Sequence, residues 1–256
     1  MMHHLRQQLR AWGSKTNLVR NYLAALGFLT RLGPVSQAPD MAACVPLFPV
    51  VGASLGLVLA APLALGLFGG HPLAGAFAYA VANIWLTRGL HLDGFADVAD
   101  AWGSLARGER FFTIMKDSRI GAFGGMALIV AVAGQICLGA ELLPAGRVWV
   151  LAFAPVLGRT TAVALMWSCR DLRRPGLGAL FLPGATWTNT LTALGITVLL
   201  GLLWAGPARL GLGCLLAGIV MYKLARLARQ NGGLNGDFLG AAIVGGELAA
   251  LLAGLV

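Results

Sequence analysis

The sequence predicts an all-α, polytopic transmembrane helix bundle of about seven spans, preceded by an N-terminal interfacial helix. Hydrophobic residues make up 58% of the 256 residues and charged residues only 11%, whereas soluble domains carry about 25% charged residues. Apolar stretches of about 18 residues or more recur along the chain, and each is long enough to cross a hydrocarbon core about 30 Å thick. Glycine is frequent without a fixed period, as membrane helices tolerate.

The first expected element is an amphipathic helix over residues 18–32. Leu18, Tyr22, Leu26 and Leu29 fall on one side of it, which indicates a helix on the membrane surface or packed under the bundle. No apolar core separates the basic residues that precede it, so we expect no cleavable signal peptide. The spans are expected at residues 45–68, 72–90, 121–143, 147–168, 188–206, 208–225 and 238–256.

The distribution of Lys and Arg predicts the orientation of the bundle. Loops on one side hold sixteen of these residues and loops on the other side hold two, with Arg159 inside a span. Because positively charged loops stay in the cytoplasm, we expect the N-terminus on the cytoplasmic side of the inner membrane. Residues 1–256 then form a single integral membrane domain, with a cytoplasmic arm and amphipathic helix at 1–44 and a cytoplasmic acidic active-site segment at 91–120.

The net charge of +9 is accounted for by this orientation and by contact with anionic membrane lipid. The basic residues are spread over short loops, and no basic patch interleaved with aromatic residues is present. We therefore expect no nucleic acid partner.

Half of the acidic residues lie in one short segment. Five of the ten acids fall between residues 93 and 117. Asp93, Asp97 and Asp100 are spaced i, i+4 and i+7, so a helix places them on one face. Three such carboxylates repel one another unless a cation lies between them, and Mg²⁺ binds through a few carboxylates, waters and substrate phosphates. The pattern predicts a magnesium site; the alternative is a solvated helix face neutralised by nearby Arg.

The turn before the next expected span carries further charges. Lys116, Ser118 and Arg119 are candidates to bind a diphosphate, and Asp117 is a candidate to complete the metal site. An ordinary positively charged flank would explain Lys116 and Arg119 but not the acid between them. His91 lies at the start of the acidic helix. It is a candidate metal ligand or base, and a capping or structural role is the alternative.

Two later parts of the sequence, one loop and one residue within a span, are polar or charged. The glycine-rich segment 231–237 contains Asn235 and Asp237, which we predict to bind substrate because glycine permits close backbone approach to a ligand; an ordinary loop is the alternative. Arg159 lies about mid-span, where a charge costs about 2.5–3.5 kcal/mol on insertion scales. We expect it to face the interior and to meet Glu247 or a substrate phosphate, unless it is a structural residue that snorkels.

The motifs HLDGFADVAD at residues 91–100 and MKDSRIG at residues 115–121 closely resemble those of the cobalamin synthase family, adenosylcobinamide-GDP ribazoletransferase. Their mutual spacing is specific. Ala101 and Asn235 depart from the usual Gly and Thr of the family, but neither change removes a charge. The likeness extends nearly end to end, through FLTR at 28–31, FPVVG at 48–52, GR at 158–159 and GGLNGDFLG at 232–240.

The resemblance implies a Mg²⁺-dependent transferase of the cytoplasmic membrane that acts late in adenosylcobalamin biosynthesis. Adenosylcobinamide-GDP and α-ribazole, or its 5′-phosphate, would be the substrates, and a membrane assembly with other late-pathway enzymes would explain the location. The expected catalytic residues are Asp93, Asp97, His91, Lys116 and Arg119. The expected metal ligands are Asp93, Asp97, Asp100 and Asp117. The expected substrate-binding residues are Lys116, Ser118, Arg119, Arg159, Asn235 and Asp237.

Two other function classes stay open at this point. A CDP-alcohol phosphotransferase of lipid synthesis uses related carboxylates, but Asp97 and Val98 stand where its pattern has Ala-Arg, and Arg107 stands near where it has Gly. A cation-coupled membrane transporter would place its acids near the bilayer midplane, whereas these acids lie at predicted cytoplasmic ends of spans. Release of GMP from substrate distinguishes the enzyme from the transporter.

Overall fold

The computed structural model describes residues 18–34 and 41–256, so the expected arm over residues 1–17, with its predicted lack of a signal peptide, lies outside the described residues. All named elements of the described part are helices, and its one β feature is an isolated bridge between Arg173 and Leu234. The predicted all-α class is confirmed.

Six helices in the described ranges are long and apolar enough to cross a membrane. Each overlaps a predicted span, which confirms a multi-pass bundle, and the predicted span that began at residue 208 continues past its expected end at 225. The six are the 3-10 helix η1 (Met41–Leu47) continued by α2 (Phe48–Ala64), α6 (Ala122–Leu142), α7 (Val148–Ser168), α8 (Trp187–Trp204), α9 (Pro207–Asn231) and α10 (Gly236–Ala253).

The helix predicted over residues 72–90 ends earlier than expected. α3 (Pro72–Leu86) has 15 residues, which places it among the shorter apolar helices. The chain then turns at Arg88 and Gly89, whose φ angles are 59° and 67°, before α4 (Leu90–Gly103) begins. A left-handed φ at a non-glycine residue needs support from its surroundings.

The amphipathic segment supplies this support. It forms a helix over Leu18–Leu29, three residues shorter than predicted, in which Leu26 and Leu29 of the predicted apolar stripe are buried and Leu18 is exposed. The Arg88 guanidinium donates to the carbonyl oxygen of Phe28, at the end of this helix, at 2.5 Å. The N-terminal helix thereby stabilises the turn from which α4 starts.

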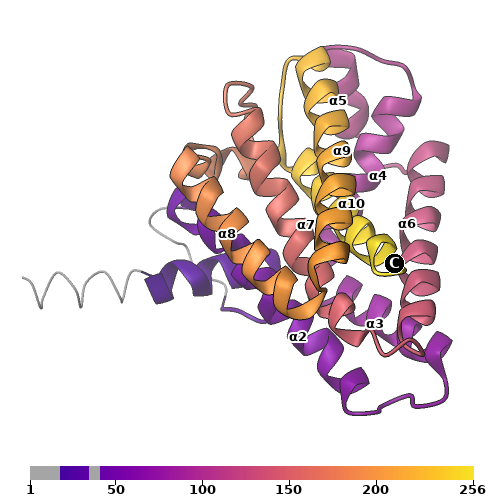
Figure 1. Cartoon of the computed structure of the whole chain (residues 1–256). Helices are drawn as coiled ribbons and strands as arrows, with labels where there is room; N and C mark the ends of the chain where they lie inside the picture. The colour runs from indigo at the N-terminus through magenta and orange to yellow at the C-terminus, as the bar shows by residue number, and fades with distance from the viewer. Residues whose placement is uncertain (1–17, 35–40) are drawn as a thin grey trace, which may run out of the picture.

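α7 and α10 occupy the centre of the bundle (Figure 1). Their spans are 83% and 72% buried, against 22–28% for α6, α8 and α9. The two central helices approach closely because a methyl group on Gly246 would lie only 2.8 Å from Cα of Gly158. Small residues permit such close helix packing inside membranes.

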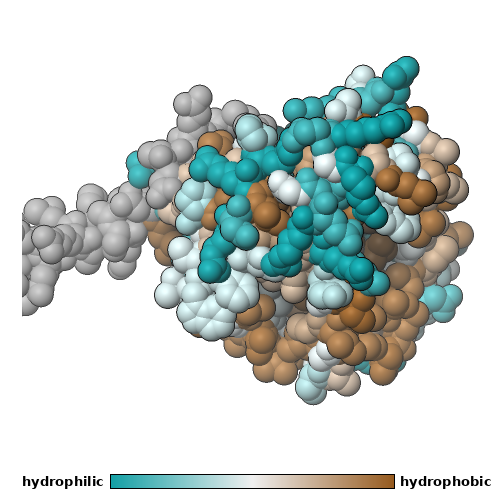
Figure 2. Space-filling model, turned by 90° about the horizontal axis from the view of Figure 1, so that it is seen from above, coloured by the Kyte–Doolittle hydropathy of each residue, from teal (hydrophilic) through white to brown (hydrophobic). Residues whose placement is uncertain are grey.

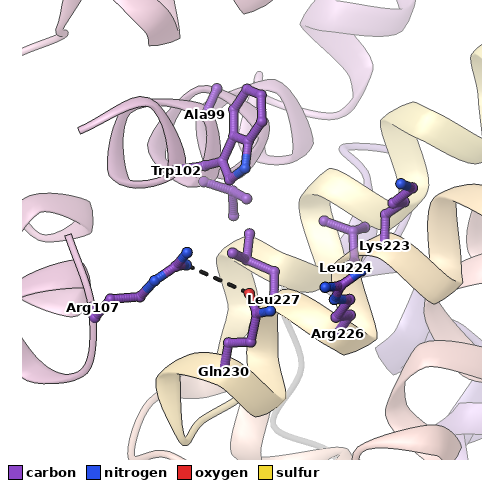
Figure 3. A pocket seen from close by; sticks show the side chains of 9 residues that line it. Ala99, Trp102, Arg107, Lys223, Leu224, Arg226, Leu227 and Gln230 are labelled. Carbon is purple, nitrogen blue, oxygen red and sulfur yellow. Dashed lines mark hydrogen bonds between the residues drawn. The ribbon is translucent and has the colours of Figure 1, made fainter. Parts of the chain in front are cut away.

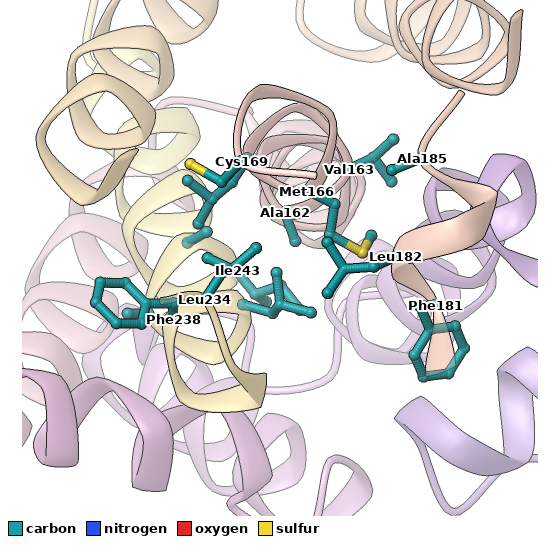
Figure 4. Close-up of a cluster of buried hydrophobic side chains, with 14 of the residues drawn as sticks. Ala162, Val163, Met166, Cys169, Phe181, Leu182, Ala185, Leu234, Phe238 and Ile243 are labelled. Atoms are coloured by element: carbon teal, nitrogen blue, oxygen red, sulfur yellow. The ribbon is translucent and has the colours of Figure 1, made fainter. Parts of the chain in front are cut away.

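A hydrophobic cluster joins the two central helices to the segment after α7 (Figure 4). Met166 of α7, Ile243 of α10 and Phe181 of the connecting segment are all buried in it. Because this cluster holds the connecting segment against α10, it fixes the wall of the cavity described below.

The polar segments lie toward one end of the bundle. α4, α5 (Glu109–Met115) and the C-terminal end of α9 are together near the top of Figure 1. Seen from that end, hydrophilic side chains cover the middle of the surface and hydrophobic side chains lie on its flanks (Figure 2). The acidic segment is therefore displaced from the middle of the bundle.

Candidate functional site

The carboxylates predicted to share a helix face do share one, because residues 93–100 lie within α4. Asp93 is exposed, and Asp97 and Asp100 are partly buried. Val98 and Ala101 on other faces of the helix are buried and anchor it to the protein. The i, i+4, i+7 spacing thus presents three acids on one side.

α10 brings a fourth carboxylate, Asp237, to this site. The approach is possible because residue 94 is glycine: a Cβ atom there would lie 2.7 Å from Cα of Asp237. Asn235 begins α10 by accepting the backbone N–H of Phe238 at 3.4 Å, and its Nδ2 donates to Oδ2 of Asp237 at 2.7 Å. Two residues predicted to bind substrate are therefore joined to the acidic face of α4.

The four acids interact electrostatically. Burial raises the pKa of Asp97 to about 7, and the nearby carboxylates of Asp237, Asp93 and Asp100 contribute to the shift. Like charges disfavour ionisation of their neighbours, whereas a bound divalent cation favours it. The electrostatic repulsion at this site is of the kind that a cation would relieve.

The donor set fits Mg²⁺ bound together with a substrate. Mg²⁺ usually takes one or two carboxylates, keeps several waters and binds substrate phosphates. Within residues 18–34 and 41–256, no three His, Cys, Asp or Glu side chains converge closely enough to enclose a metal ion by themselves. An open set of carboxylates such as Asp93 and Asp97 has room for waters and phosphate oxygens.

Asp100 makes a different set of contacts from its neighbours. Its Oδ2 accepts the backbone N–H of Gly121 at 2.8 Å, and its Oδ1 accepts that of Gly124 at 2.7 Å. These amides belong to the N-terminus of α6, where a carboxylate stabilises the helix. Asp100 therefore ties α4 to α6, and its role as a metal ligand stays a prediction.

The charged turn between α5 and α6 is exposed. Arg119 donates to both carboxylate oxygens of Asp117, at 3.0 and 2.7 Å. These hydrogen bonds lower the pKa of Asp117 to about 2. Lys116 and Ser118 are exposed beside this pair. Asp117 is thus paired with its neighbour in sequence, and the predicted metal and diphosphate roles of this turn stay predictions.

A cavity of about 290 Å³ lies between the starts of α4 and α10. Most of its lining is apolar and includes Phe28, Phe48 and Phe181. Part of its wall comes from Pro175, Gly176 and Gly178, which sequence reasoning missed because they carry no charge and no recognisable motif. The polar residues that line the cavity are His91, Asp93, Asn235 and Asp237.

Three buried polar residues, from α3, α7 and α10, are joined by hydrogen bonds. The Arg159 guanidinium is completely buried and donates to Oε1 of Glu247 at 2.6 Å, which is one of the two partners expected from the sequence. Nδ2 of Asn83 donates to the same carboxylate at 3.1 Å. Burial, with the charges of Arg159 and Arg88, holds the pKa of His91 well below its usual range. His91 is therefore neutral and a weak base.

A larger hollow, of about 610 Å³, lies between α4 and α9 (Figure 3). Trp102 of α4 faces Lys223 and Arg226 of α9 across it, and Arg107 donates to Gln230 at 3.5 Å. No carboxylate is among the residues that line this hollow. Its α4 residues lie opposite the acidic stripe, so it is separate from the candidate site.

Comparisons of this sequence with a family model and with curated proteins point to the same family. Residues 21–255 match the family model described as cobalamin-5-phosphate synthase. The adenosylcobinamide-GDP ribazoletransferase of Nitratidesulfovibrio vulgaris (strain DSM 19637 / Miyazaki F) is 48% identical over 235 residues, which cover 91% of this chain and 94% of the relative. The protein of that name from Klebsiella pneumoniae (strain 342) is 38% identical over 251 residues, with coverage of 92% and 99%. No solved structure matches significantly.

Proposed function

The chain belongs to the cobalamin-5-phosphate synthase family, and we propose that it catalyses the reaction for which its relatives are named, that of an adenosylcobinamide-GDP ribazoletransferase. It is a membrane-embedded transferase of late cobalamin biosynthesis. The observation that carries the proposal is the group of acids that α4 and α10 place beside one cavity, with Asp93, Asp97 and Asp237 as its centre.

In the proposed reaction the 3′-hydroxyl of α-ribazole, or of its 5′-phosphate, attacks the cobinamide-side phosphorus of adenosylcobinamide-GDP. The new P–O bond forms as the bond to the GMP oxygen breaks, and the hydroxyl proton passes to a base. The products are GMP and adenosylcobalamin, or its 5′-phosphate. A carboxylate of the acidic group or His91 would accept the proton; burial holds the pKa of His91 well below its usual range.

We propose Asp93 and Asp97 as the main ligands of Mg²⁺, with Asp237 beside them. Bound there, Mg²⁺ would neutralise charge on the diphosphate and on the leaving GMP. The raised pKa of Asp97 supports this assignment: burial is its main cause, but the neighbouring carboxylates contribute, and a bound cation would relieve their repulsion. Lys116 and Arg119, which are exposed next to the start of α6, would bind the diphosphate.

The proposed location is the cytoplasmic membrane, with the acidic end of the bundle in the cytoplasm. The positively charged loops support this orientation. It also gives the nucleotide-bearing substrate direct access to the carboxylates from the aqueous side.

A GMP-release assay tests the proposal. Detergent-purified protein is mixed with adenosylcobinamide-GDP and α-ribazole, with Mg²⁺ present or chelated. We expect GMP and a cobalamin product to form only with the metal. Asp93→Ala and Asp97→Ala should abolish transfer while membrane insertion stays intact, and Asp171→Ala, which removes an exposed acid outside the site, should keep activity. Near-normal turnover by purified Asp97→Ala protein would contradict the assignment.

A further inference from the structure

We infer that the 290 Å³ cavity beside Asp93 binds the acceptor, with the aromatic base of α-ribazole against the phenylalanine rings of its lining and the ribose 3′-hydroxyl at the carboxylates. This inference rests on the proposed function and extends it, because it assigns one of the two substrates to one defined space.

One part of the cavity lining is formed by three aromatic rings that contact one another. The ring centroids of Phe28 and Phe181 are 4.8 Å apart, and those of Phe48 and Phe181 are 5.3 Å apart. The three rings come from the N-terminal helix, from the start of α2 and from the segment between α7 and α8. Aromatic rings favour stacked and edge-on contacts with another ring, so a planar bicyclic base fits this part of the lining.

The other part of the cavity can receive a hydroxyl group. The carboxylates of Asp93 and Asp237 line it and accept hydrogen bonds. A base must come within hydrogen-bond reach of the proton it removes. A nucleoside whose base packs against the phenylalanine rings would therefore direct its ribose toward the acidic group, where the proposed reaction takes place.

Volume and charge exclude the other substrate from this space. Ligand pockets typically measure about 300–1,000 Å³, so the cavity is at the lower limit. It admits a nucleoside but not a corrinoid macrocycle. Its lining contains neither Lys nor Arg, so it offers no cation to a diphosphate. The donor must approach from outside and present its phosphorus at the mouth, beside Asp93.

Binding of α-ribazole to the purified full-length protein, measured calorimetrically without donor, tests the inference. Phe181→Leu removes one ring and keeps an apolar side chain. Leu90→Trp adds bulk at a lining position that is 43% exposed, where folding tolerates it. The matched control is Phe153→Leu, which removes an equally buried ring in the other hydrophobic cluster.

The two lining variants should weaken α-ribazole binding, and Phe181→Leu should do so by between about twofold and tenfold, the value of one aromatic contact. The KM for adenosylcobinamide-GDP should stay unchanged in both, and Phe153→Leu should bind α-ribazole normally. The inference is overturned if wild-type protein does not bind α-ribazole, if both variants bind it normally, or if they raise the KM of the donor instead. Binding without GMP release would leave the cavity assignment standing and contradict the proposed reaction.

Discussion

Gly94 and Asp237 are in backbone contact: a methyl group at residue 94 would lie 2.7 Å from Cα of Asp237. This approach joins the helix that carries three acids to the start of α10, which carries the fourth. The proposed cation site therefore depends on the distance between two helices, and on side-chain volume at a position that bears no functional group.

Gly94→Ala should lower transferase activity at least tenfold, because the added methyl group meets backbone rather than a flexible side chain and must push α4 away from α10. Gly125→Ala is the matched control: it is also a helical glycine, but a Cβ there meets nothing within 4 Å. Equal activity of the two variants in the GMP-release assay would show that the contact does not control the site.

The raised pKa of Asp97 predicts that the stability of the metal-free protein depends on pH. Its pKa is about 7 in the folded protein, against an ordinary value of 3.8. The folded state thus binds the proton more tightly, and the free energy of unfolding should fall as pH rises from about 4 through about 7. Thermal unfolding in chelator across this range measures the slope.

Asp97→Asn should remove most of that slope, whereas Asp171→Asn should retain it. Adding Mg²⁺ should restore stability mainly at the alkaline end, where the carboxylates are ionised. Identical pH profiles for wild type and Asp97→Asn would show that this carboxyl is not the source.

Asp100 should stabilise the folded protein, in addition to contributing a carboxylate to the acidic face of α4. Asp100→Ala removes the acceptor of the Gly121 and Gly124 amides, and loss of a helix N-terminal acceptor typically costs about 0.5–2 kcal/mol. Its unfolding temperature should fall, while that of Asp93→Ala should not. If Asp100→Ala unfolds like wild type but is inactive, its principal role is at the metal.

Substitutions at Arg159 and Glu247, which form a buried ion pair, should have non-additive effects on the free energy of unfolding. Glu247→Ala leaves the Arg159 guanidinium buried without its carboxylate, a change that costs about 3–5 kcal/mol in buried pairs. Replacing both residues with Met should recover much of that loss, as measured by unfolding in mixed micelles. Additive losses in the single and double variants would mean that the two charges do not stabilise each other.

The sequence by itself determined the class of the fold and most of its spans. Hydropathy is a property of each segment alone, so the apolar runs predicted α6, α7, α8 and α10 closely. The same holds for the acidic stripe: the spacing of Asp93, Asp97 and Asp100 needs only a helix to place them on one face. The motifs around them also sufficed to indicate the family to which the chain belongs.

The short α3 could not be predicted in this way. Its end depends on the turn at Arg88, which is stabilised by carbonyl groups of a helix that lies about sixty residues earlier in the chain. The sequence pattern carries no information about that distant contact, so the predicted span extended to residue 90.

Only the tertiary structure decided which acids share the site and what lies beside them. Asp237 joins α4 because two glycine-containing helices pack closely, Asp100 caps α6, and Asp117 pairs with Arg119. The ring cluster around Phe181 combines three segments that are far apart in the chain. Contacts of this kind depend on how helices pack against one another, and the local periodicity of a sequence does not encode that packing.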